Sequence, residues 1–213
     1  IKIRNKFSNL SLSILNDNFD YIKKINDGAK FLNKVLKRDG VIYGVTTGYG
    51  DSCVQNVTSS LHKKLPLNLV RFHGCGLGNF FDEETTRAIL AVRLCSLSFG
   101  FSGVRYDLLQ SLEMLLKNDI LPLIPEEGSV GASGDLTPLS YVARALIGEE
   151  NVRYQGGEYL SADLFKTLKH NPLVLEPKEG LALMNGTSVM TAIAAIAYKK
   201  ADYLGKLCSR ITA

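Results

Sequence analysis

The sequence lacks the patterns that identify most membrane, secreted and metal-binding proteins. It has no run of about 18 uninterrupted apolar residues, which a membrane-spanning helix requires. No basic segment followed by an apolar core opens the chain, so these residues show no signal peptide. The four cysteines, Cys53, Cys75, Cys95 and Cys208, are far apart and form no CxxC pair. This spacing predicts reduced, mostly buried thiols in a cytoplasmic protein, and neither a disulfide framework nor a metal site.

Strong charge of one sign is also lacking. The chain has 25 basic and 21 acidic residues, which gives a formal net charge of +4. Because the basic residues are spread thinly along the chain, they do not predict nucleic-acid binding. A hydrophobic share of 46% and a charged share of 22% predict a globular chain and exclude disorder. The 213 residues suggest about one and a half domains. Because residue 1 is Ile1 and Ala213 ends inside an apolar pattern, we expect part of a longer protein.

Apolar residues recur at helical spacing along most of the chain, which predicts a mainly α fold. A short strand is expected at Val41–Val45 and a hairpin within Val152–Leu160, around Gly156-Gly157. Helices are expected at Phe19–Leu36, Ser59–His73, Glu83–Ser98, Tyr106–Lys117, Leu139–Ile147 and Ala162–Leu168, and from Ser188 to the end. We predict a small N-terminal α(+β) part over 1–105. Residues 106–213 are then expected to begin a long central helix bundle that is truncated here.

Glycine-rich loops interrupt these helices, and none fits a common nucleotide or hydrolase motif. His73–Gly78 reads HGCGLG after a helix, which favours a helix C-cap over a dinucleotide loop. A serine-hydrolase elbow would need glycine where Asp135 stands. The same loop can be interpreted as a turn in which Thr137 caps a helix and Pro138 is its first residue.

The tripeptide Ala132-Ser133-Gly134 has a covalent chemistry of its own. In a tight bend, the Gly134 nitrogen can attack the carbonyl carbon of Ala132, because glycine has no Cβ to block the approach. Loss of water closes a five-membered ring, and dehydration of Ser133 adds an exocyclic methylidene. The product, 4-methylidene-imidazol-5-one, is an electrophile made from the chain itself, with no metal or nucleotide. A helix N-terminus nearby would stabilise negative charge on its oxygen.

Four segments together resemble the family of histidine and aromatic amino acid ammonia-lyases and aminomutases. Gly128–Ser140, reading GSVGASGDLTPLS, is similar to the segment that forms the family's cofactor. Tyr43–Gly50, YGVTTGYG, resembles the catalytic tyrosine loop, and Leu183–Thr187, LMNGT, resembles the asparagine loop. Asn68–Gly74, NLVRFHG, resembles the segment that lines the pocket for the substrate ring.

The resemblance implies roles for individual residues. The substrate amine would add to the methylidene group made from Ser133, and Tyr43, as tyrosinate, would remove the β-proton before ammonia leaves. Asn185 would position the cofactor or the substrate carboxylate, whereas local sequence also allows an Asn-Gly turn that caps the last helix. Gly50 and Gly131 would permit close approach of the backbone.

The substrate is not settled by these motifs. In the family, the positions of Phe72 and His73 face the substrate ring. Histidine-specific members resemble Ser-His there, tyrosine-specific members His-Leu and phenylalanine-specific members Phe-Leu, so this chain mixes the patterns. His73 could bond an imidazole or a phenol, which favours histidine or tyrosine over phenylalanine, or it could be structural. No residue separates a lyase from an aminomutase, and an inactive structural relative is a further alternative.

Family chains are more than twice this long. The resemblance therefore implies that a carboxylate-binding arginine, another catalytic tyrosine and a glutamate lie outside these residues. Family enzymes are homotetramers whose active sites combine three subunits. We accordingly expect a cytoplasmic enzyme that binds an aromatic amino acid and no nucleic acid or membrane, and whose 213-residue part is inactive alone.

Overall fold

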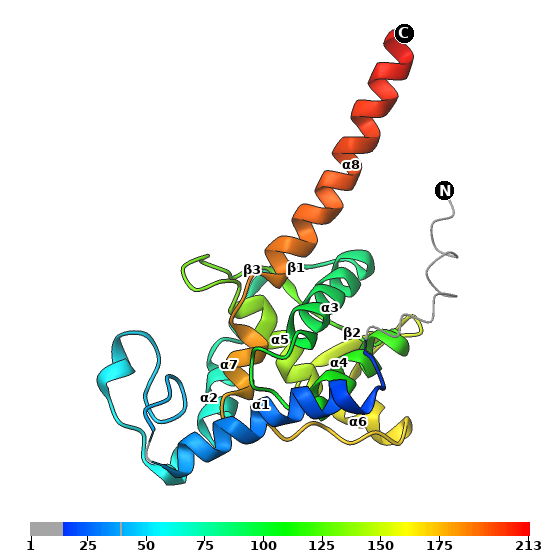
Figure 1. Cartoon of the computed structure of the whole chain (residues 1–213). Coiled ribbons are helices and arrows are strands. Elements are labelled where there is room, and N and C mark those ends of the chain that lie inside the picture. Colours follow the sequence, from blue (N-terminus) through cyan, green and yellow to red (C-terminus); the bar gives the residue numbers. More distant parts are fainter. Residues whose placement is uncertain (1–14, 39) are drawn as a thin grey trace.

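The computed structural model describes residues 15–38 and 40–213, and most of them are helical (Figure 1). The α-helices are α1 Phe19–Lys37, α2 Leu65–Phe72, α3 Glu83–Ser98, α4 Tyr106–Lys117, α5 Thr137–Leu146, α6 Ser161–Thr167, α7 Glu179–Met184 and α8 Ser188–Thr212. Two 3-10 helices, η1 Gly50–Val54 and η2 Ser59–Leu61, lie between α1 and α2. The mainly α class that the sequence predicts is confirmed.

The strands are short and form two small antiparallel sheets. β1 Leu77–Phe80 pairs antiparallel with β3 Pro125–Glu127, with Leu77 opposite Glu127. β2 Leu121–Pro122, β4 Asn151–Tyr154 and β5 Gly157–Leu160 form an antiparallel sheet in the order β2-β4-β5. The β4–β5 pair is the hairpin that the sequence predicts.

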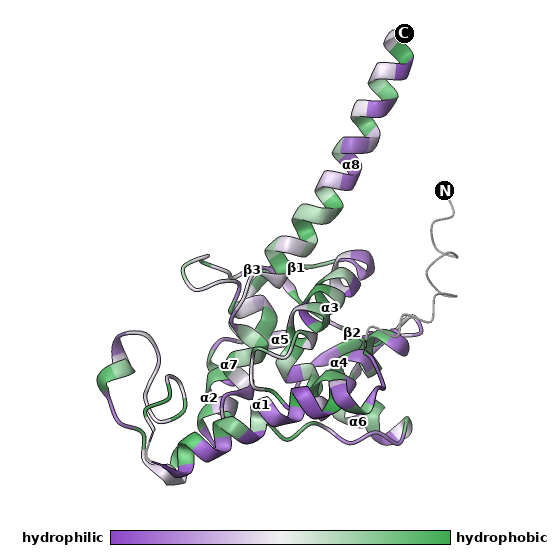
Figure 2. Ribbon diagram, viewed as in Figure 1, coloured by the Kyte–Doolittle hydropathy of each residue, from purple (hydrophilic) through white to green (hydrophobic). Residues whose placement is uncertain are grey.

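The core is built from the leucine-rich faces of α3, α4 and α5, which join one buried cluster. Figure 2 shows these apolar faces turned inward. The residues that carry it are at most 1% exposed: Ile89, Leu90, Leu94, Leu108, Leu109, Leu112, Val142 and Leu146. Such burial stabilises the fold by about 1.5 to 3 kcal/mol for each large side chain.

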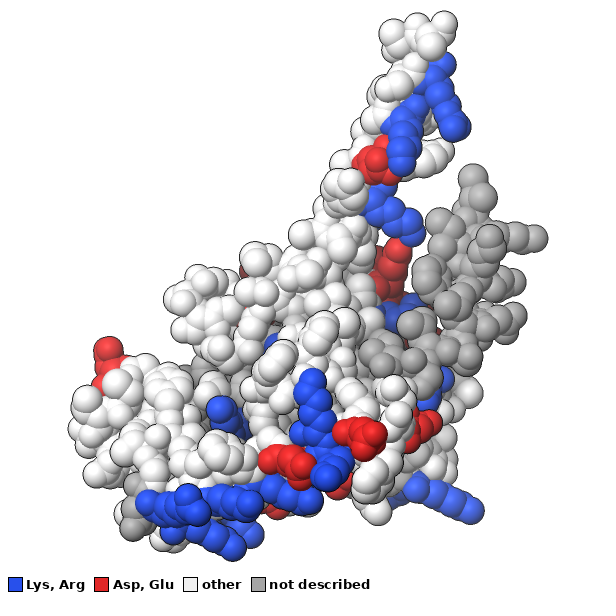
Figure 3. Space-filling model, viewed as in Figure 1, with Lys and Arg blue, Asp and Glu red and all other residues white. Residues whose placement is uncertain are grey.

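Helix α1 lies across this core with one apolar face. Asn18 caps it by accepting a hydrogen bond from the N–H of Asp20 (2.8 Å), and Ile25 and Ala29 are its buried residues. Its other side carries lysines that line one edge of the molecule in Figure 3. The amphipathic pattern of the sequence thus places α1 at the surface.

Helix α8 packs against α3 only through its first turns, where Val189 and Ala192 are buried. Beyond them it projects away from the rest of the structure (Figure 1). By length and composition, Glu179–Thr212 could cross a membrane. That indication is weak, because core helices meet the same criterion and Asn185–Thr187 breaks the helix within this stretch.

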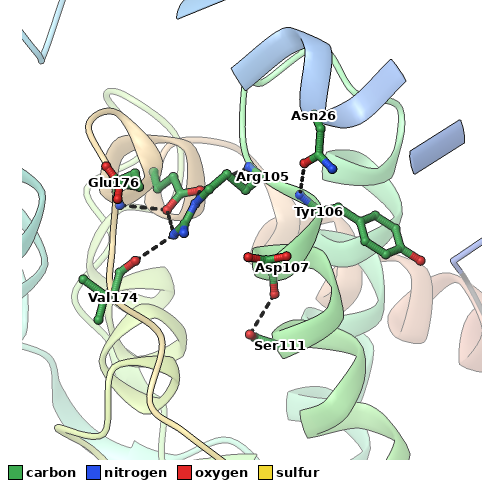
Figure 4. A network of polar contacts seen from close by, with 8 residues as sticks. Asn26, Arg105, Tyr106, Asp107, Ser111, Val174 and Glu176 are labelled. Atoms are coloured by element: carbon green, nitrogen blue, oxygen red, sulfur yellow. Dashed lines mark hydrogen bonds and ion pairs between the residues drawn. The ribbon is translucent and has the colours of Figure 1, made fainter. Parts of the chain in front are cut away.

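A buried ion pair fixes the start of α7, the helix that leads to the asparagine loop (Figure 4). The guanidinium of Arg105 donates to both carboxylate oxygens of Glu179 (2.9 and 2.8 Å), and to the carbonyl of Val174 (2.7 Å). The backbone N–H of Glu176 donates to the same carboxylate (2.8 Å). Glu179 is 2% exposed, so these bonds replace the water that its charge has lost.

The sequence-based predictions of a strand at Val41–Val45 and of one continuous helix over Ser59–His73 are wrong. Val41–Val45 is a turn and not a strand: the N–H groups of Val45 and Thr46 both donate to the carbonyl of Ile42 (3.0 Å). Gly44, at φ +70°, allows this turn, which satisfies locally the groups that a strand would pair. Ser59–His73 is not one helix, because η2 ends at Leu61 and α2 begins only at Leu65.

The predicted N-cap is also wrong. Helix α5 begins at Thr137, so Thr137 and Pro138 lie in its first turn, where proline is tolerated because the N–H would be unpaired. Leu136 stands at the N-cap with φ +38° and gives no side-chain bond.

The four cysteines are exposed, contrary to the prediction of buried thiols, and they are unpaired. Cys53 lies in η1 and Cys208 on the projecting part of α8, both away from the core.

Candidate active site

Tyr43 lies in the turn after α1 with its side chain half exposed. Its hydroxyl oxygen accepts a hydrogen bond from the backbone N–H of Gly50 (2.9 Å). Gly50 has φ +56°, a conformation that glycine adopts without strain. The contact fixes the position of the phenol oxygen beside the backbone of Gly50.

Tyr49 is the second tyrosine of this loop and differs from Tyr43 in its surroundings. The two rings meet edge to face, with centroids 6.2 Å apart. Burial, and to a lesser degree the neighbouring Tyr43, raises the pKa of Tyr49 to about 12. Its buried hydroxyl has no hydrogen-bond partner within the described part of the chain. Tyr49 is therefore protonated at cellular pH.

The tripeptide Ala132–Ser133–Gly134 forms a tight bend directly before α5. Gly131 and Ala132 both form isolated bridges to Gly134, which has φ +85°. A Cβ on Gly134 would lie 2.4 Å from the carbonyl oxygen of Gly186, so no other residue fits there. Glycine at position 134 thus allows both the bend and the close approach of the Gly186 backbone. Helix α5 begins three residues later, and its N-terminus lies close to the bend.

The asparagine loop holds this bend from the other side. The side-chain N–H of Asn185 donates to the carbonyl of Ser133 (2.8 Å), and the N–H of Asp135 donates to the carbonyl of Gly186 (2.7 Å). Asn185 is the C-cap of α7 and does not cap α8. That function falls to Asp135, whose carboxylate accepts bonds from the N–H groups of Val189 (2.6 Å) and Met190 (3.4 Å). Sequence spacing gave no sign of this cap.

Phe72 and His73 end helix α2. Phe72 is 80% exposed, and its ring meets that of His73 edge to face at 5.3 Å. Nδ1 of His73 lies 2.9 Å from the carbonyl of Leu69. A carbonyl can only accept, so Nδ1 carries the proton and Nε2 of the neutral ring is left as a hydrogen-bond acceptor.

One pocket of about 550 Å³ brings these loops together. Of the residues predicted for the site, Tyr43, Gly50, Phe72, His73, Ser133 and Asn185 line it. Ala132 and Gly134 flank Ser133 without lining the pocket, and Gly131 has open space around it. Asn68 and Leu69 also line the pocket, as the resemblance of Asn68–Gly74 implied, whereas sequence reasoning missed Tyr49, Leu65, Leu136 and Leu181. The sequence places these residues in predicted helices or turns, and such spacing does not show which side chains face a cavity.

The pocket therefore has room for an aromatic ring. The Ser133 carbonyl, the Asn185 amide and the Tyr43 phenol would lie beside that ring. No three His, Cys, Asp or Glu side chains of the described residues are grouped as metal ligands.

The family model, the related sequences and the similar solved structures agree on one family. The family model for aromatic amino acid lyases matches residues 13–213. A histidine ammonia-lyase from Shouchella clausii is 40% identical over 192 residues, which are 90% of this chain and 38% of that protein. Among solved structures, a tyrosine aminomutase from Streptomyces globisporus superposes with a TM-score of 0.77 at 42% identity, over 82% of this chain and 33% of its own.

A phenylalanine aminomutase from Pantoea agglomerans gives a TM-score of 0.82 at 31% identity, covering 87% of this chain and 36% of the other. The chain thus spans about a third of the length of the relatives that it matches. The motif loops, the shared fold and the family match agree, and the chain belongs to the aromatic amino acid lyase family.

Proposed function

We propose that the protein containing this chain eliminates ammonia non-oxidatively from an aromatic L-amino acid. The observation that carries the proposal is the meeting of Tyr43, Ser133 and Asn185 around one pocket. These residues come from three loops far apart in the sequence. A pocket that collects a candidate base, a reactive serine and an orienting amide has the parts that such an elimination needs.

The electrophile would arise from Ala132, Ser133 and Gly134. A bond forms between the Gly134 nitrogen and the Ala132 carbonyl carbon, and one water leaves with that carbonyl oxygen. A second water leaves with the hydroxyl of Ser133. Once formed, the methylidene-imidazolone ring supplies an electrophile to which an amine can add. The tight bend and the closeness of Gly134 to Gly186 support this assignment.

Tyr43 would remove the β-proton of the substrate. Its oxygen accepts the Gly50 N–H, a contact that strengthens when the oxygen carries charge. The Asn185 amide, bonded to the Ser133 carbonyl, would hold Ala132–Ser133–Gly134 in a fixed position relative to Tyr43.

For the substrate, we propose histidine or tyrosine in preference to phenylalanine. The free acceptor Nε2 of His73 can bond the imidazole N–H of histidine or the phenol O–H of tyrosine. A phenylalanine ring would leave that acceptor without a partner, which is costly in a closed site. Phe72 would lie against the ring.

An aminomutase is the second candidate, because a tyrosine aminomutase is 42% identical to this chain. It would use the same residues and return the amine to the β-carbon.

Mass spectrometry of the protein at its natural length tests the proposal. Trypsin releases Asn118–Arg144, which contains the whole tripeptide. We expect this peptide to be lighter by about 36 Da, the mass of two water molecules. Ser133→Ala should abolish half or all of the deficit and most of the activity, whereas Val130→Ala, at an 86% exposed side chain of the same loop, should retain both. An unshifted peptide from active protein would refute the proposed electrophile.

Ultraviolet detection of a conjugated acrylate, with histidine, tyrosine and phenylalanine compared in parallel, tests the substrate. Turnover of phenylalanine alone would contradict the role given to His73. A β-amino acid product would establish the aminomutase.

A further inference from the structure

Arg93 is a buried cation beneath the asparagine loop, on an element that carries no motif residue. It lies in the middle of α3 and is only 4% exposed. Burial lowers the pKa of Arg93 to about 10, against the opposing effect of the Asp135 carboxylate. Arg93 therefore remains charged at cellular pH. A buried charge is costly unless it is bonded, so its partners are informative.

The hydrogen-bond partners of Arg93 lie in the segment Ala182–Ser188, which runs from the end of α7 into the start of α8. Nη2 donates to the carbonyl of Ala182 and to the carbonyl of Asn185 (2.9 Å). Nη1 donates to the hydroxyl of Ser188 (3.4 Å). The two carbonyls are at the C-terminal end of α7, where the helix itself offers no donor, so the guanidinium supplies what the helix lacks.

The contact is close enough to fix the backbone of this segment. A Cβ on Gly186 would lie 2.4 Å from Nη1 of Arg93, so the loop rests directly on the guanidinium. On its opposite side, the same loop contacts the tripeptide: the Asn185 amide donates to the Ser133 carbonyl, and the Gly186 carbonyl accepts from Asp135. The two residues that hold Ser133 and Asp135 are thus held in turn by Arg93.

We infer that Arg93 is a positioning residue that sets the Asn185 amide against the Ser133 carbonyl, and so controls ring closure at Ala132–Ser133–Gly134. This inference rests on the proposed function. Arg93 does not touch the substrate pocket, so it acts only through the loop. Arg93→Met would keep the stem of the side chain within α3 and remove all three bonds to the segment.

The test follows ring closure in time. The protein at its natural length is synthesised in a cell-free system, quenched at intervals and digested, and the mass deficit of Asn118–Arg144 is measured. For Arg93→Met we expect the deficit to appear about 10- to 100-fold more slowly, because small misplacements of reacting groups have effects of this size. Arg87→Met is the matched control. Arg87 lies on the same helix, bonds Asp119 at the surface, and should leave the rate unchanged.

A double-mutant cycle separates positioning from general support of the fold. If Arg93 acts through Asn185, Arg93→Met should slow ring closure by less than about twofold when Asn185→Ala is already present. An equal slowing in both backgrounds, or an unchanged rate in Arg93→Met, would overturn the inference. If Arg93→Met does not yield folded protein, Arg93→Lys is used in the same cycle. Lysine keeps the charge but cannot bond both carbonyls in the planar geometry of arginine. A deficit missing from the unaltered protein would instead refute the proposed function, and this inference with it.

Discussion

At the scale of single residues, the pocket is lined by two tyrosines that have different surroundings. The Tyr43 oxygen is bonded to the Gly50 N–H and faces the pocket, whereas the Tyr49 hydroxyl is buried and unpaired within the described residues. Where neighbouring environments separate two like groups, the acid and base roles can be assigned to them individually.

Tyr43→Phe should therefore lower kcat by about 10²- to 10⁴-fold, because the β-proton loses its base. Tyr49→Phe removes a hydroxyl that is protonated and unpaired, so it should change kcat by less than about tenfold. Steady-state kinetics of the two variants at natural length checks this. Equal losses in both variants would show that the base has been assigned wrongly.

The raised pKa of Tyr49 predicts how the stability of the fold changes at alkaline pH. Its pKa is raised from 10 in the unfolded chain to about 12 in the folded one. The folded state therefore holds this proton more tightly, and the resulting stability is present below pH 10 and lost as the pH rises towards 12. We expect Tyr49→Phe to reduce the loss of melting temperature over this interval. An identical decline in the variant would contradict the burial effect.

Substitution of His73 is expected to change the substrate preference. His73→Leu removes the acceptor Nε2 and leaves an apolar surface beside Phe72. We expect kcat/KM for phenylalanine, relative to that for histidine or tyrosine, to rise by about 10- to 100-fold. Parallel assays with the three amino acids measure this ratio, and a ratio that does not move would make His73 a structural residue only.

At the scale of elements, short loops carry the residues proposed for the chemistry, and longer helices hold these loops in place. The sequence predicted most helices to within a few residues, since their apolar spacing is regular. It also predicted Tyr43, Ser133 and Asn185 as site residues from their glycine-rich loops, and the structure places all three at one pocket. It did not identify Arg93 or the capping role of Asp135. Their contacts join residues more than 50 positions apart, and no spacing along the chain encodes such a pair.

The same scale predicts the consequence of loosening α7. Glu179 bonds Arg105 and the N–H of Glu176 at the start of the helix that ends at Asn185. Glu179→Gln weakens these charged bonds, and we expect a loss of about 2 to 3 kcal/mol in the free energy of unfolding. Chemical denaturation measures it. Glu176→Gln, which forms no side-chain bond to Arg105, should change stability by less than about 0.5 kcal/mol.

At the scale of the whole molecule, α8 leaves an apolar stripe without cover. Ile193, Leu204 and Ile211 recur at helical spacing and are 40%, 58% and 76% exposed. Lysine side chains such as Lys199 lie on the other side of the helix. An apolar stripe of this kind has the character of a face that packs against another helix.

This interpretation makes a prediction for the protein at its natural length. Leu204→Glu would place a charge where we expect apolar contact, so it should lower the free energy of unfolding by about 2 to 4 kcal/mol. Lys199→Glu, on the opposite side of the same helix, changes a charge by more but should alter stability by less than about 0.5 kcal/mol. Melting temperatures and sedimentation of both variants give the comparison. If the two variants match, α8 faces solvent in the complete protein. If Leu204→Glu alone changes the number of subunits, the stripe lies at a contact between chains.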